Sequence, residues 1–175
     1  MLERHGWTLH AHPLFLNQVE RLLAAVERAK QSDPGTWQGK ADTKLLAALR
    51  ALILDRIPRD PLAAEFRQGN TLGREHRHWF RAKFAGNRFR LFFRADSQAK
   101  VIVYAWVNDR DTLRKAGAGT DPYAVFGRML ASGNPPDDWP ALLATATDPN
   151  THNRFSAIGL GDTSDITIEK TAKND

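Results

Sequence analysis

The sequence predicts an α+β domain: a two-helix hairpin packed on a small twisted antiparallel sheet, followed by a C-terminal helix and a disordered tail. Two periods in the sequence support this fold class. Apolar residues recur at steps of three and four over the first sixty residues, and at steps of two between residues 78 and 94. With 175 residues, 42% of them hydrophobic, the chain has enough apolar material for one domain. We expect one helical layer to cover one face of the sheet and the other face to be open.

Two helices are expected before the sheet. The short apolar segment Trp7–His10 predicts a brief first strand, and from Pro13 a helix follows in which apolar and charged residues alternate at helical spacing. Asp33 and Pro34 match an N-cap followed by proline at the first helical position and predict a second helix, which Pro58 ends. The expected buried positions are Phe15, Val19, Leu22 and Val26 in the first helix and Leu45, Ala48, Leu49, Leu52, Ile53 and Ile57 in the second.

Three antiparallel strands are expected next. Residues 78–84 and 88–94 alternate between polar and apolar side chains, and Ala85-Gly86-Asn87 between them is a hairpin turn signal. Lys100–Val107 is almost continuously apolar, which predicts a central strand covered on both sides.

The C-terminal part of the chain is expected to contain less regular structure. Asp121 and Pro122 repeat the N-cap signature and predict a third helix that ends near Gly133. Trp139–Ala146 is expected to add a short helical turn. From Asp148 onward the sequence has no clear period, so we divide the chain into a domain of residues 1–147 and a flexible tail of residues 148–175.

The segment between Arg67 and Arg94 is strongly basic. It contains eight Lys/Arg residues and a single acid, Glu75, and six aromatic residues are interleaved with the basic ones. The resulting local charge of +7 exceeds the formal net charge of +5 of the whole chain. Like charges opposite one another on neighbouring strands are destabilising, so we expect an anionic partner. This pattern predicts one open patch that binds RNA, although a solvated polar face is the alternative; the patch comprises Arg81, Lys83, Arg88, Arg90 and Arg94.

The same patch offers the groups needed to cleave RNA without a metal. Cleavage requires a base for the ribose 2′-OH, charge stabilisation at phosphorus and an acid for the leaving 5′ oxygen. Arginines supply the charge stabilisation, and Lys83, which is surrounded by cations, is the candidate proton carrier. His76 and His78 are alternatives because histidine titrates near neutrality. The run Asp109-Arg110-Asp111 either orients such groups or caps a turn.

Several other classes of protein are excluded or disfavoured. Cysteine is absent, which excludes disulfides, thiolate zinc sites and cysteine nucleophiles. There is no P-loop, no Gly-x-Gly-x-x-Gly and no His-Glu-x-x-His motif, and the acids are too scattered for a two-metal nuclease centre. His5, His10 and His12 are close in sequence but lack an accompanying acid or thiolate, so we expect no metal and no cofactor. The charged N-terminus and the lack of a long apolar run predict a cytoplasmic protein.

A set of short segments resembles the YhaV family of bacterial toxins. The segments occur in order over residues 6–143, and they are specific as a set although each is weak alone. They are Gly6-Trp7, Ala11-His12-Pro13, Thr43-Lys44-Leu45-Leu46, Phe66-Arg67-Gln68-Gly69, residues 78–84 and 88–94, Trp106-Val107-Asn108-Asp109, Thr112-Leu113-Arg114 and Asn134-Pro135-Pro136-Asp137-Asp138-Trp139.

This resemblance implies membership of the wider RelE/ParE group, with a RelE-like fold of the microbial-ribonuclease type. It implies the toxin of a type II toxin-antitoxin system, a metal-independent endoribonuclease that cleaves mRNA, on or off the ribosome, and inhibits translation. It further implies that a PrlF-type antitoxin holds the toxin inactive and that the complex binds operator DNA and regulates its own operon.

The resemblance also implies roles for particular residues. RelE-type enzymes use a basic pair on one strand, an arginine on the next, and an arginine and a tyrosine after the last strand. Arg81 and Lys83 are similar to the pair and Arg90 to the hairpin arginine, Arg110 or Arg114 stands for the late arginine, and no tyrosine is found at the corresponding place. The predicted catalytic residues are Arg81, Lys83, Arg90, Arg114 and His78, and the predicted RNA-binding residues are Arg88, Arg94, Trp79, Arg110, Asn108 and Asp109.

Two competing hypotheses come from other functional classes. A ParE-like toxin would poison a protein such as DNA gyrase, and DNA synthesis would then fall before protein synthesis. A non-catalytic binder would retain RNA with a salt dependence of about −0.7 per phosphate contacted and release no shorter product.

Overall fold

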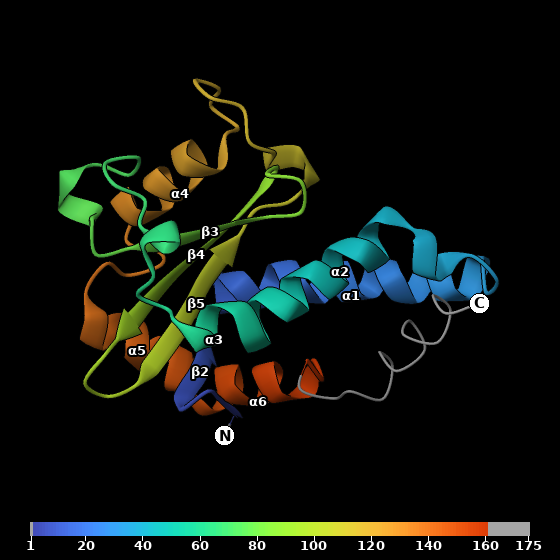
Figure 1. The fold of residues 1–175 in the computed structure, drawn as a ribbon, viewed down its shortest axis with the longest axis horizontal. Coiled ribbons are helices and arrows are strands. Elements are labelled where there is room, and N and C mark those ends of the chain that lie inside the picture. Colours follow the sequence, from blue (N-terminus) through green and yellow to red (C-terminus); the bar gives the residue numbers. More distant parts are fainter. Residues whose placement is uncertain (1, 161–175) are drawn as a thin grey trace.

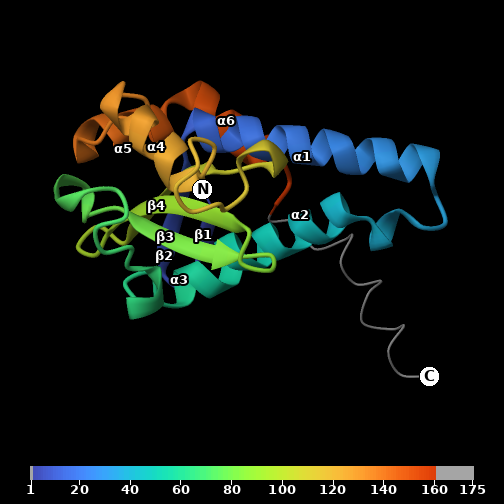
Figure 2. The same ribbon diagram turned by 90° about the horizontal axis from the view of Figure 1, so that it is seen from above.

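The computed structural model describes residues 2–160 and contains a five-stranded sheet with helices on both sides (Figures 1 and 2). The strand order is β1-β2-β5-β4-β3. Neighbouring strands are antiparallel except β2 and β5, which run parallel. The sheet is therefore mixed, and the prediction of a purely antiparallel sheet is wrong. The strands are β1 (Leu2–Arg4), β2 (Trp7–Ala11), β3 (Phe80–Phe84), β4 (Phe89–Asp96) and β5 (Val101–Val107).

Six α-helices accompany this sheet within residues 2–160. They are α1 (Pro13–Ser32), α2 (Ala41–Ala51), α3 (Ile57–Arg59), α4 (Pro122–Ala131), α5 (Trp139–Thr147) and α6 (Pro149–Ala157), and a π-helical turn, Leu52–Arg56, joins α2 to α3. In this part of the chain no helix combines the length and the apolar character that a bilayer crossing requires.

The first helix begins where the sequence predicts. His12 is the N-cap of α1, and its Nδ1 atom accepts a hydrogen bond from the backbone N–H of Leu14 at 3.1 Å. Pro13 occupies the first turn, where its missing N–H costs nothing. Phe15, Val19 and Val26 are buried, as predicted.

The predicted start of the second helix is wrong. Asp33 ends α1 rather than capping a new helix, because its backbone N–H donates to the carbonyl of Ala29 at 2.9 Å. The next long helix begins at Ala41. Pro58 lies inside the last helical turn, which ends one residue later at Arg59. Of the six predicted apolar positions, Leu49, Leu52, Ile53 and Ile57 are buried, and Leu45 and Ala48 are partly buried against the core.

Both faces of the sheet are covered, so the predicted open face is wrong. In Figure 2, α2 and α3 lie on one side of the sheet, and α4 and α5 lie on the other. One buried cluster joins α1–α3 to inward residues such as Phe93 and Tyr104. A second buried cluster joins α4 and α5, through residues such as Phe126 and Leu142, to Phe92 and Trp106 of the sheet. The physical reason is that β4 and β5 carry large apolar side chains on both of their faces, and each set needs a covering layer.

The β3–β4 hairpin and the central position of β5 are confirmed. Ala85, Gly86 and Asn87 turn the chain with positive φ angles, and β5 pairs with β2 on one side and β4 on the other. The predicted short turn at Trp139 is the helix α5.

The prediction of a flexible tail from residue 148 is wrong for residues 149–157. Residues 149–157 form α6, in which Thr151 and Phe155 are buried. Arg154 anchors the helix to α1 through Glu20 at 2.9 Å and Asn17 at 2.8 Å. The remainder of the predicted tail, residues 161–175, lies outside the described residues.

Candidate functional site

The cations of the β3–β4 hairpin share one face of the sheet but do not form one open patch. Lys83 lies opposite Arg90 and Arg81 lies opposite Phe92, as the alternation predicts. However, Arg81 and Arg90 are buried, with exposed fractions of 8% and 3%. The prediction of a single open patch is therefore wrong, because α4, α5 and neighbouring loops cover most of this face.

The guanidinium groups diverge toward different partners. Arg81 donates to the backbone carbonyls of Glu65 and Arg67, at 3.1 and 3.0 Å, beside the sheet edge. Arg94 donates to the carbonyl of Asp137 at 2.8 Å, and Arg90 to the carbonyl of Asn87 at the same distance. Carbonyl oxygens thus replace water around the buried Arg81 and Arg90 and the half-buried Arg94, and these three cations point to different places.

A smaller set of residues does converge, at the turn end of the hairpin. We call Lys83, Arg88, Arg90, Arg114 and Tyr123 the basic cluster. The Nε atom of Arg90 donates to the Tyr123 hydroxyl at 3.1 Å. The guanidinium carbons of Arg114 and Arg90 lie 5.0 and 5.8 Å from the centre of the Tyr123 ring. Two cations therefore contact one phenol ring, a favourable electrostatic arrangement.

A buried carboxylate positions this cluster. Asp121 is the N-cap of α4, and one of its oxygens accepts from the N–H of Tyr123 at 3.1 Å. The other oxygen accepts from Arg114 at 2.6 Å and from the N–H of Lys115 at 2.8 Å. The start of α4 and the loop after β5 are thus fixed to each other by one side chain.

Asn108 fixes the same loop to β4. Its Oδ1 atom accepts from the backbone N–H of Arg90 at 2.7 Å, and its amide donates to the carbonyl of Thr112 at 2.8 Å. Asn108 is itself buried. This predicted RNA-binding residue therefore lies behind the surface and supports the residues around it.

Some residues of the basic cluster are exposed to solvent and others are buried behind them. Lys83, Arg88 and Arg114 are exposed, whereas Arg90 and Tyr123 are buried behind them. The backbone N–H of Arg114 donates to the carbonyl of Arg88 at 3.1 Å, so these two cations leave adjacent points of the backbone. An anion that approaches from solvent meets Lys83, Arg88 and Arg114 first.

Tyr123 is the residue that the sequence reasoning missed. It follows Arg114 by nine positions and reaches the cluster because α4 begins at the turn end of the hairpin. The Asp121-Pro122 signature located the start of this helix correctly. Of the two candidates for the late arginine, Arg114 contacts Tyr123 and belongs to the cluster, whereas Arg110 lies elsewhere.

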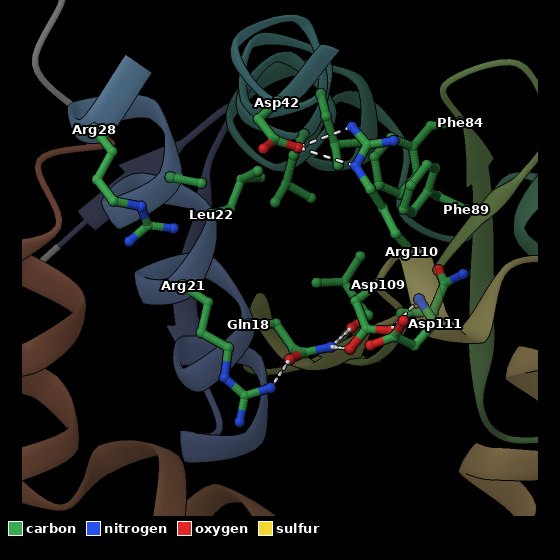
Figure 3. Close-up of a pocket in the computed structure, with 15 residues that line it drawn as sticks. Gln18, Arg21, Leu22, Arg28, Asp42, Phe84, Phe89, Asp109, Arg110 and Asp111 are labelled. Atoms are coloured by element: carbon green, nitrogen blue, oxygen red, sulfur yellow. Dashed lines mark hydrogen bonds and ion pairs between the residues drawn. The ribbon is translucent and has the colours of Figure 1, made fainter. Parts of the chain in front are cut away.

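Arg110 and Asp109 line a separate cleft between α1, α2 and the end of the sheet (Figure 3). The cleft has a volume of about 420 Å³. Arg110 pairs with Asp42 at 2.8 Å, and Gln18 donates to Asp109 at 3.1 Å. Burial would raise the pKa of Asp109, but hydrogen bonds from Gln18, Thr112 and the backbone of Asp111 outweigh it and hold the pKa below its ordinary value. Asp109 therefore stays ionised and caps the following turn.

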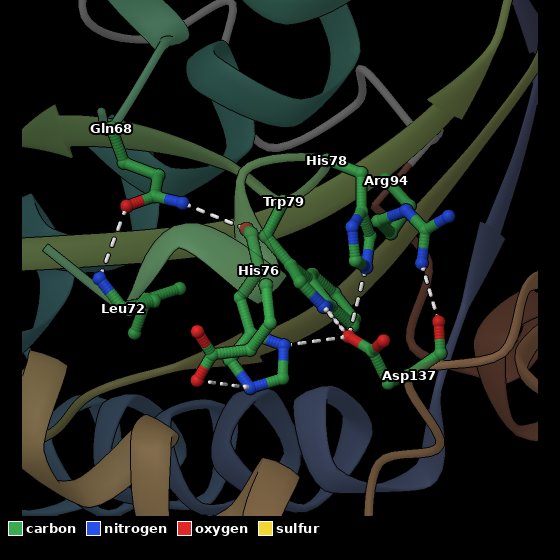
Figure 4. Close-up of polar contacts among 8 residues, drawn as sticks. Gln68, Leu72, His76, His78, Trp79, Arg94 and Asp137 are labelled. Carbon is green, nitrogen blue, oxygen red and sulfur yellow. Dashed lines mark hydrogen bonds and ion pairs between the residues drawn. The ribbon is translucent and has the colours of Figure 1, made fainter. Parts of the chain in front are cut away.

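The opposite end of the hairpin holds a second group of polar residues, shown in Figure 4. We call His76, His78, Trp79 and Asp137 the histidine cluster. One oxygen of Asp137 accepts from Trp79 Nε1 at 2.7 Å, from His78 Nε2 at 2.8 Å and from His76 Nδ1 at 3.0 Å. Burial would raise the pKa of Asp137, but these hydrogen bonds lower it overall. Arg94 stacks beside Trp79, with 5.2 Å from its guanidinium carbon to the ring centre.

The predicted site residues therefore fall into separate places. Trp79, His78 and Arg94 lie at the histidine end, and Trp79 is fully buried. Asp109 and Arg110 lie in the cleft, and Arg81 lies at the sheet edge. Lys83, Arg88, Arg90 and Arg114 lie together.

Comparisons with known proteins identify the family. A family model described as a toxin with endonuclease activity, of a toxin-antitoxin system, matches residues 9–147. The chain belongs to the YhaV toxin family. It is 45% identical over 139 residues to the ribonuclease toxin YhaV of Escherichia coli K12, and equally to the YhaV toxins of the CFT073 and O157:H7 strains. Each alignment covers 79% of this chain and 90% of the relative. No solved structure matches the chain.

Membership of the YhaV family establishes an enzymatic role. The chain is the endonuclease toxin of a toxin-antitoxin system, and an antitoxin protein is its partner. This activity favours the nuclease hypothesis over both the gyrase poison and the non-catalytic binder. The YhaV match ends at the last residue of α5, so it includes the basic cluster and the histidine cluster.

Proposed function

We propose that this chain is a metal-independent endoribonuclease that cleaves mRNA in the cytoplasm and thereby inhibits translation. The observation that carries the proposal is the contact of Arg90 and Arg114 with Tyr123, beside Lys83. These residues supply positive charge and exchangeable protons at one place. RNA is the expected substrate because the relative from Escherichia coli K12 is named a ribonuclease toxin.

Cleavage proceeds by transesterification at a phosphodiester. The ribose 2′-oxygen loses its proton and attacks phosphorus, so that the bond from O2′ to phosphorus forms and the bond from phosphorus to O5′ breaks. The products are a 2′,3′-cyclic phosphate and a free 5′-hydroxyl, which receives a proton. The enzyme must stabilise the additional negative charge on the phosphorane oxygens, a task suited to guanidinium groups.

Arg114 and Arg90 have different tasks in this scheme. Arg114 is exposed enough, at 33% of its side chain, to contact the phosphorane directly. Asp121 holds it at 2.6 Å and so limits its loss of conformational entropy on binding. Arg90 acts from behind, through its hydrogen bond to the Tyr123 hydroxyl.

Lys83 and Tyr123 carry the protons. Lys83 is the base because its exposed side chain lies opposite Arg90 and can reach a 2′-hydroxyl in solvent. The Tyr123 hydroxyl accepts from Arg90 and keeps its own proton for donation. It is therefore the acid for the leaving 5′ oxygen. Arg81 is assigned a positioning role, since it anchors the segment that contains Glu65 and Arg67 against β3.

The decisive experiment uses end-labelled mRNA and the purified full-length chain, with and without ribosomes, in buffer containing EDTA. We expect fragments that end in a 2′,3′-cyclic phosphate or a 3′-phosphate, with Arg114→Ala strongly impaired. Arg154→Ala is the matched control, because Arg154 is also an arginine with about one-third of its side chain exposed and is paired with a carboxylate, at 2.9 Å from Glu20, but is far from the hairpin in sequence. Equal cleavage by Arg114→Ala and the parent chain, or products that carry a 5′-phosphate, would reject the proposed site.

We also propose that the partner is a PrlF-type antitoxin and that the complex represses its own operon. Addition of this antitoxin should stop cleavage at equimolar ratio. A gel-shift assay should show operator DNA bound by the complex and not by the toxin alone. Operator binding by the toxin alone would contradict this part of the proposal.

A further inference from the structure

The histidine cluster has the side chains of a metal site, and the proposed cleavage chemistry makes no use of it. His76 lies at the end of the short turn Arg74–His76, His78 lies just before β3, and Asp137 lies in the linker between α4 and α5. Figure 4 shows that their polar atoms point toward one another. We propose that His76, His78 and Asp137 bind one zinc ion.

The distances suit such an ion. The three ligand atoms all lie within 4.8 Å of one another. His78 Nε2 and His76 Nδ1 are 2.8 and 3.0 Å from the same oxygen of Asp137. Because zinc bonds to nitrogen and oxygen measure about 2.0–2.2 Å, neighbouring ligands of a tetrahedral ion are about 3.3–3.5 Å apart. Each imidazole would therefore have to move away from the carboxylate by only about half an ångström, within reach of small side-chain rotations.

The donor set favours zinc over magnesium and calcium. Two imidazoles and one carboxylate match the ligand types of zinc sites, whereas magnesium and calcium prefer sites built only from oxygen. Three protein ligands leave a fourth position for water. The side chains of His78 and Asp137 are each 38% exposed, so an ion can enter from solvent.

Surrounding residues orient the ligands. Trp79 Nε1 donates to the coordinating oxygen of Asp137 at 2.7 Å and fixes the carboxylate. The second ring nitrogen of His76 is 3.9 Å from a carboxylate oxygen of Glu75. A carboxylate behind a metal-bound histidine favours the tautomer that leaves the other nitrogen free to bind the metal. Arg94 donates to the backbone oxygen of Asp137, not to the carboxylate that the ion requires.

A zinc ion at this place would connect parts of the chain that are about sixty residues apart. It would fasten the linker after α4 to the start of β3. Because the unfolded chain does not hold the three ligands together, binding would stabilise the folded state. The ion would lie at the other end of the hairpin from the basic cluster.

The test is a calorimetric titration of the full-length chain with zinc chloride at neutral pH, after EDTA treatment and dialysis. We expect one ion per chain and a higher unfolding temperature with zinc than without. His78→Gln and Asp137→Asn should abolish both effects. His5→Gln is the matched control. His5 Nε2 also contacts a carboxylate, that of Asp55 at 2.9 Å, but this pair includes one imidazole instead of two.

Cobalt provides a second measurement that does not depend on variants. Cobalt(II) in the parent chain should give the intense visible absorption of a four- or five-coordinate site, and added zinc should remove it. Circular dichroism would establish that the variants are folded. The inference is overturned if the parent chain takes up no stoichiometric zinc, if His78→Gln binds zinc as well as the parent, or if cobalt gives only the weak spectrum of the aqueous ion.

Discussion

The two ends of the β3–β4 hairpin differ in their balance of cations and carboxylates. At the turn end, two guanidinium groups contact the phenol ring of Tyr123, and one carboxylate, Asp121, pairs with Arg114. At the other end, one carboxylate, Asp137, is surrounded by three N–H donors from His76, His78 and Trp79. Both ends lie on the same face of the same two strands.

This difference indicates which end has capacity for a ligand of which charge. Cations that exceed their carboxylates retain attraction for a phosphate, which fits the turn end. A carboxylate and two imidazoles, in contrast, attract a metal cation and offer little to RNA. The presence of basic and aromatic residues in one hairpin therefore does not define one site, and the partner of each cation decides its role.

The sharpest test of the turn end is Arg114→Ala. We expect the rate of RNA cleavage to fall by about 1,000-fold, as when a group that stabilises transition-state charge is removed. The circular dichroism spectrum should stay unchanged, since the side chain is one-third exposed. Single-turnover cleavage of a short RNA measures the rate. A decrease of less than about tenfold would mean that the turn end does not stabilise the reacting phosphate.

A third kind of histidine environment sharpens the comparison through pH. His12 faces a backbone N–H instead of a carboxylate, and burial lowers its pKa from 6.5 to about 4. The unfolded chain therefore binds a proton below pH 6.5 that the folded chain does not bind until about pH 4. Stability contributed by neutral His12 is fully present above pH 6.5 and falls by roughly 3 kcal/mol as the pH decreases to about 4.

His12→Asn tests this assignment, because asparagine can still cap α1 but does not titrate. Urea unfolding at several pH values should show a smaller loss of stability in acid for the variant than for the parent chain. Equal acid sensitivity in the two proteins would show that His12 is not the group responsible.

The role of the phenol at the turn end is tested by Tyr123→Phe. Loss of the proton donor should lower the cleavage rate of RNA by about 100-fold. A substrate whose leaving group is a nitrophenol needs no proton, so it should be cleaved by this variant almost as fast as by the parent. Arg114→Ala should remain impaired on the same substrate. If the nitrophenyl substrate does not restore the activity of Tyr123→Phe, the hydroxyl does not act as the acid.

The smallest expected effects compare the two carboxylates directly. Asp121 is 5% exposed and paired with a guanidinium, whereas Asp137 is 38% exposed and accepts from two imidazoles and an indole. We expect Asp121→Asn to lower the free energy of unfolding by about 2 kcal/mol and Asp137→Asn by about 1 kcal/mol. Urea unfolding in EDTA measures both without a metal contribution. The reverse order would contradict the view that the buried carboxylate at the turn end contributes more to stability than Asp137 does.

The sequence predicted the elements whose signals are local. The hairpin was found because residues 78–94 alternate around a turn, and α4 was found because Asp121 and Pro122 form an N-terminal signature. Asp33 and Pro34 gave the same signature and misled, because Asp33 forms a hydrogen bond backward to Ala29 and ends α1. A capping pattern therefore does not show whether a residue ends the preceding helix or begins the next one.

What could not be predicted depends on contacts between distant segments. The helix α6 contains few apolar residues and is fixed by contacts such as Arg154 with Glu20, which lies 134 positions away. Arg90 was removed from solvent by α4, and Arg81 by the segment that contains Glu65 and Arg67, although their strand positions were predicted correctly. Tyr123 was missed because only tertiary packing brings it to Arg90. The predicted site residues were thus found as a group but not sorted among their four locations.

The helix α4 connects the two ends of the hairpin. Tyr123 lies in its first turn, and the chain that leaves its last turn leads to Asp137. A helix of this length is about 15 Å long and moves as a stiff rod. If an inhibitor bound near Asp137 tilted this helix, the Tyr123 hydroxyl would move away from Arg90. Such an inhibitor would lower activity without occupying the proposed cleavage site.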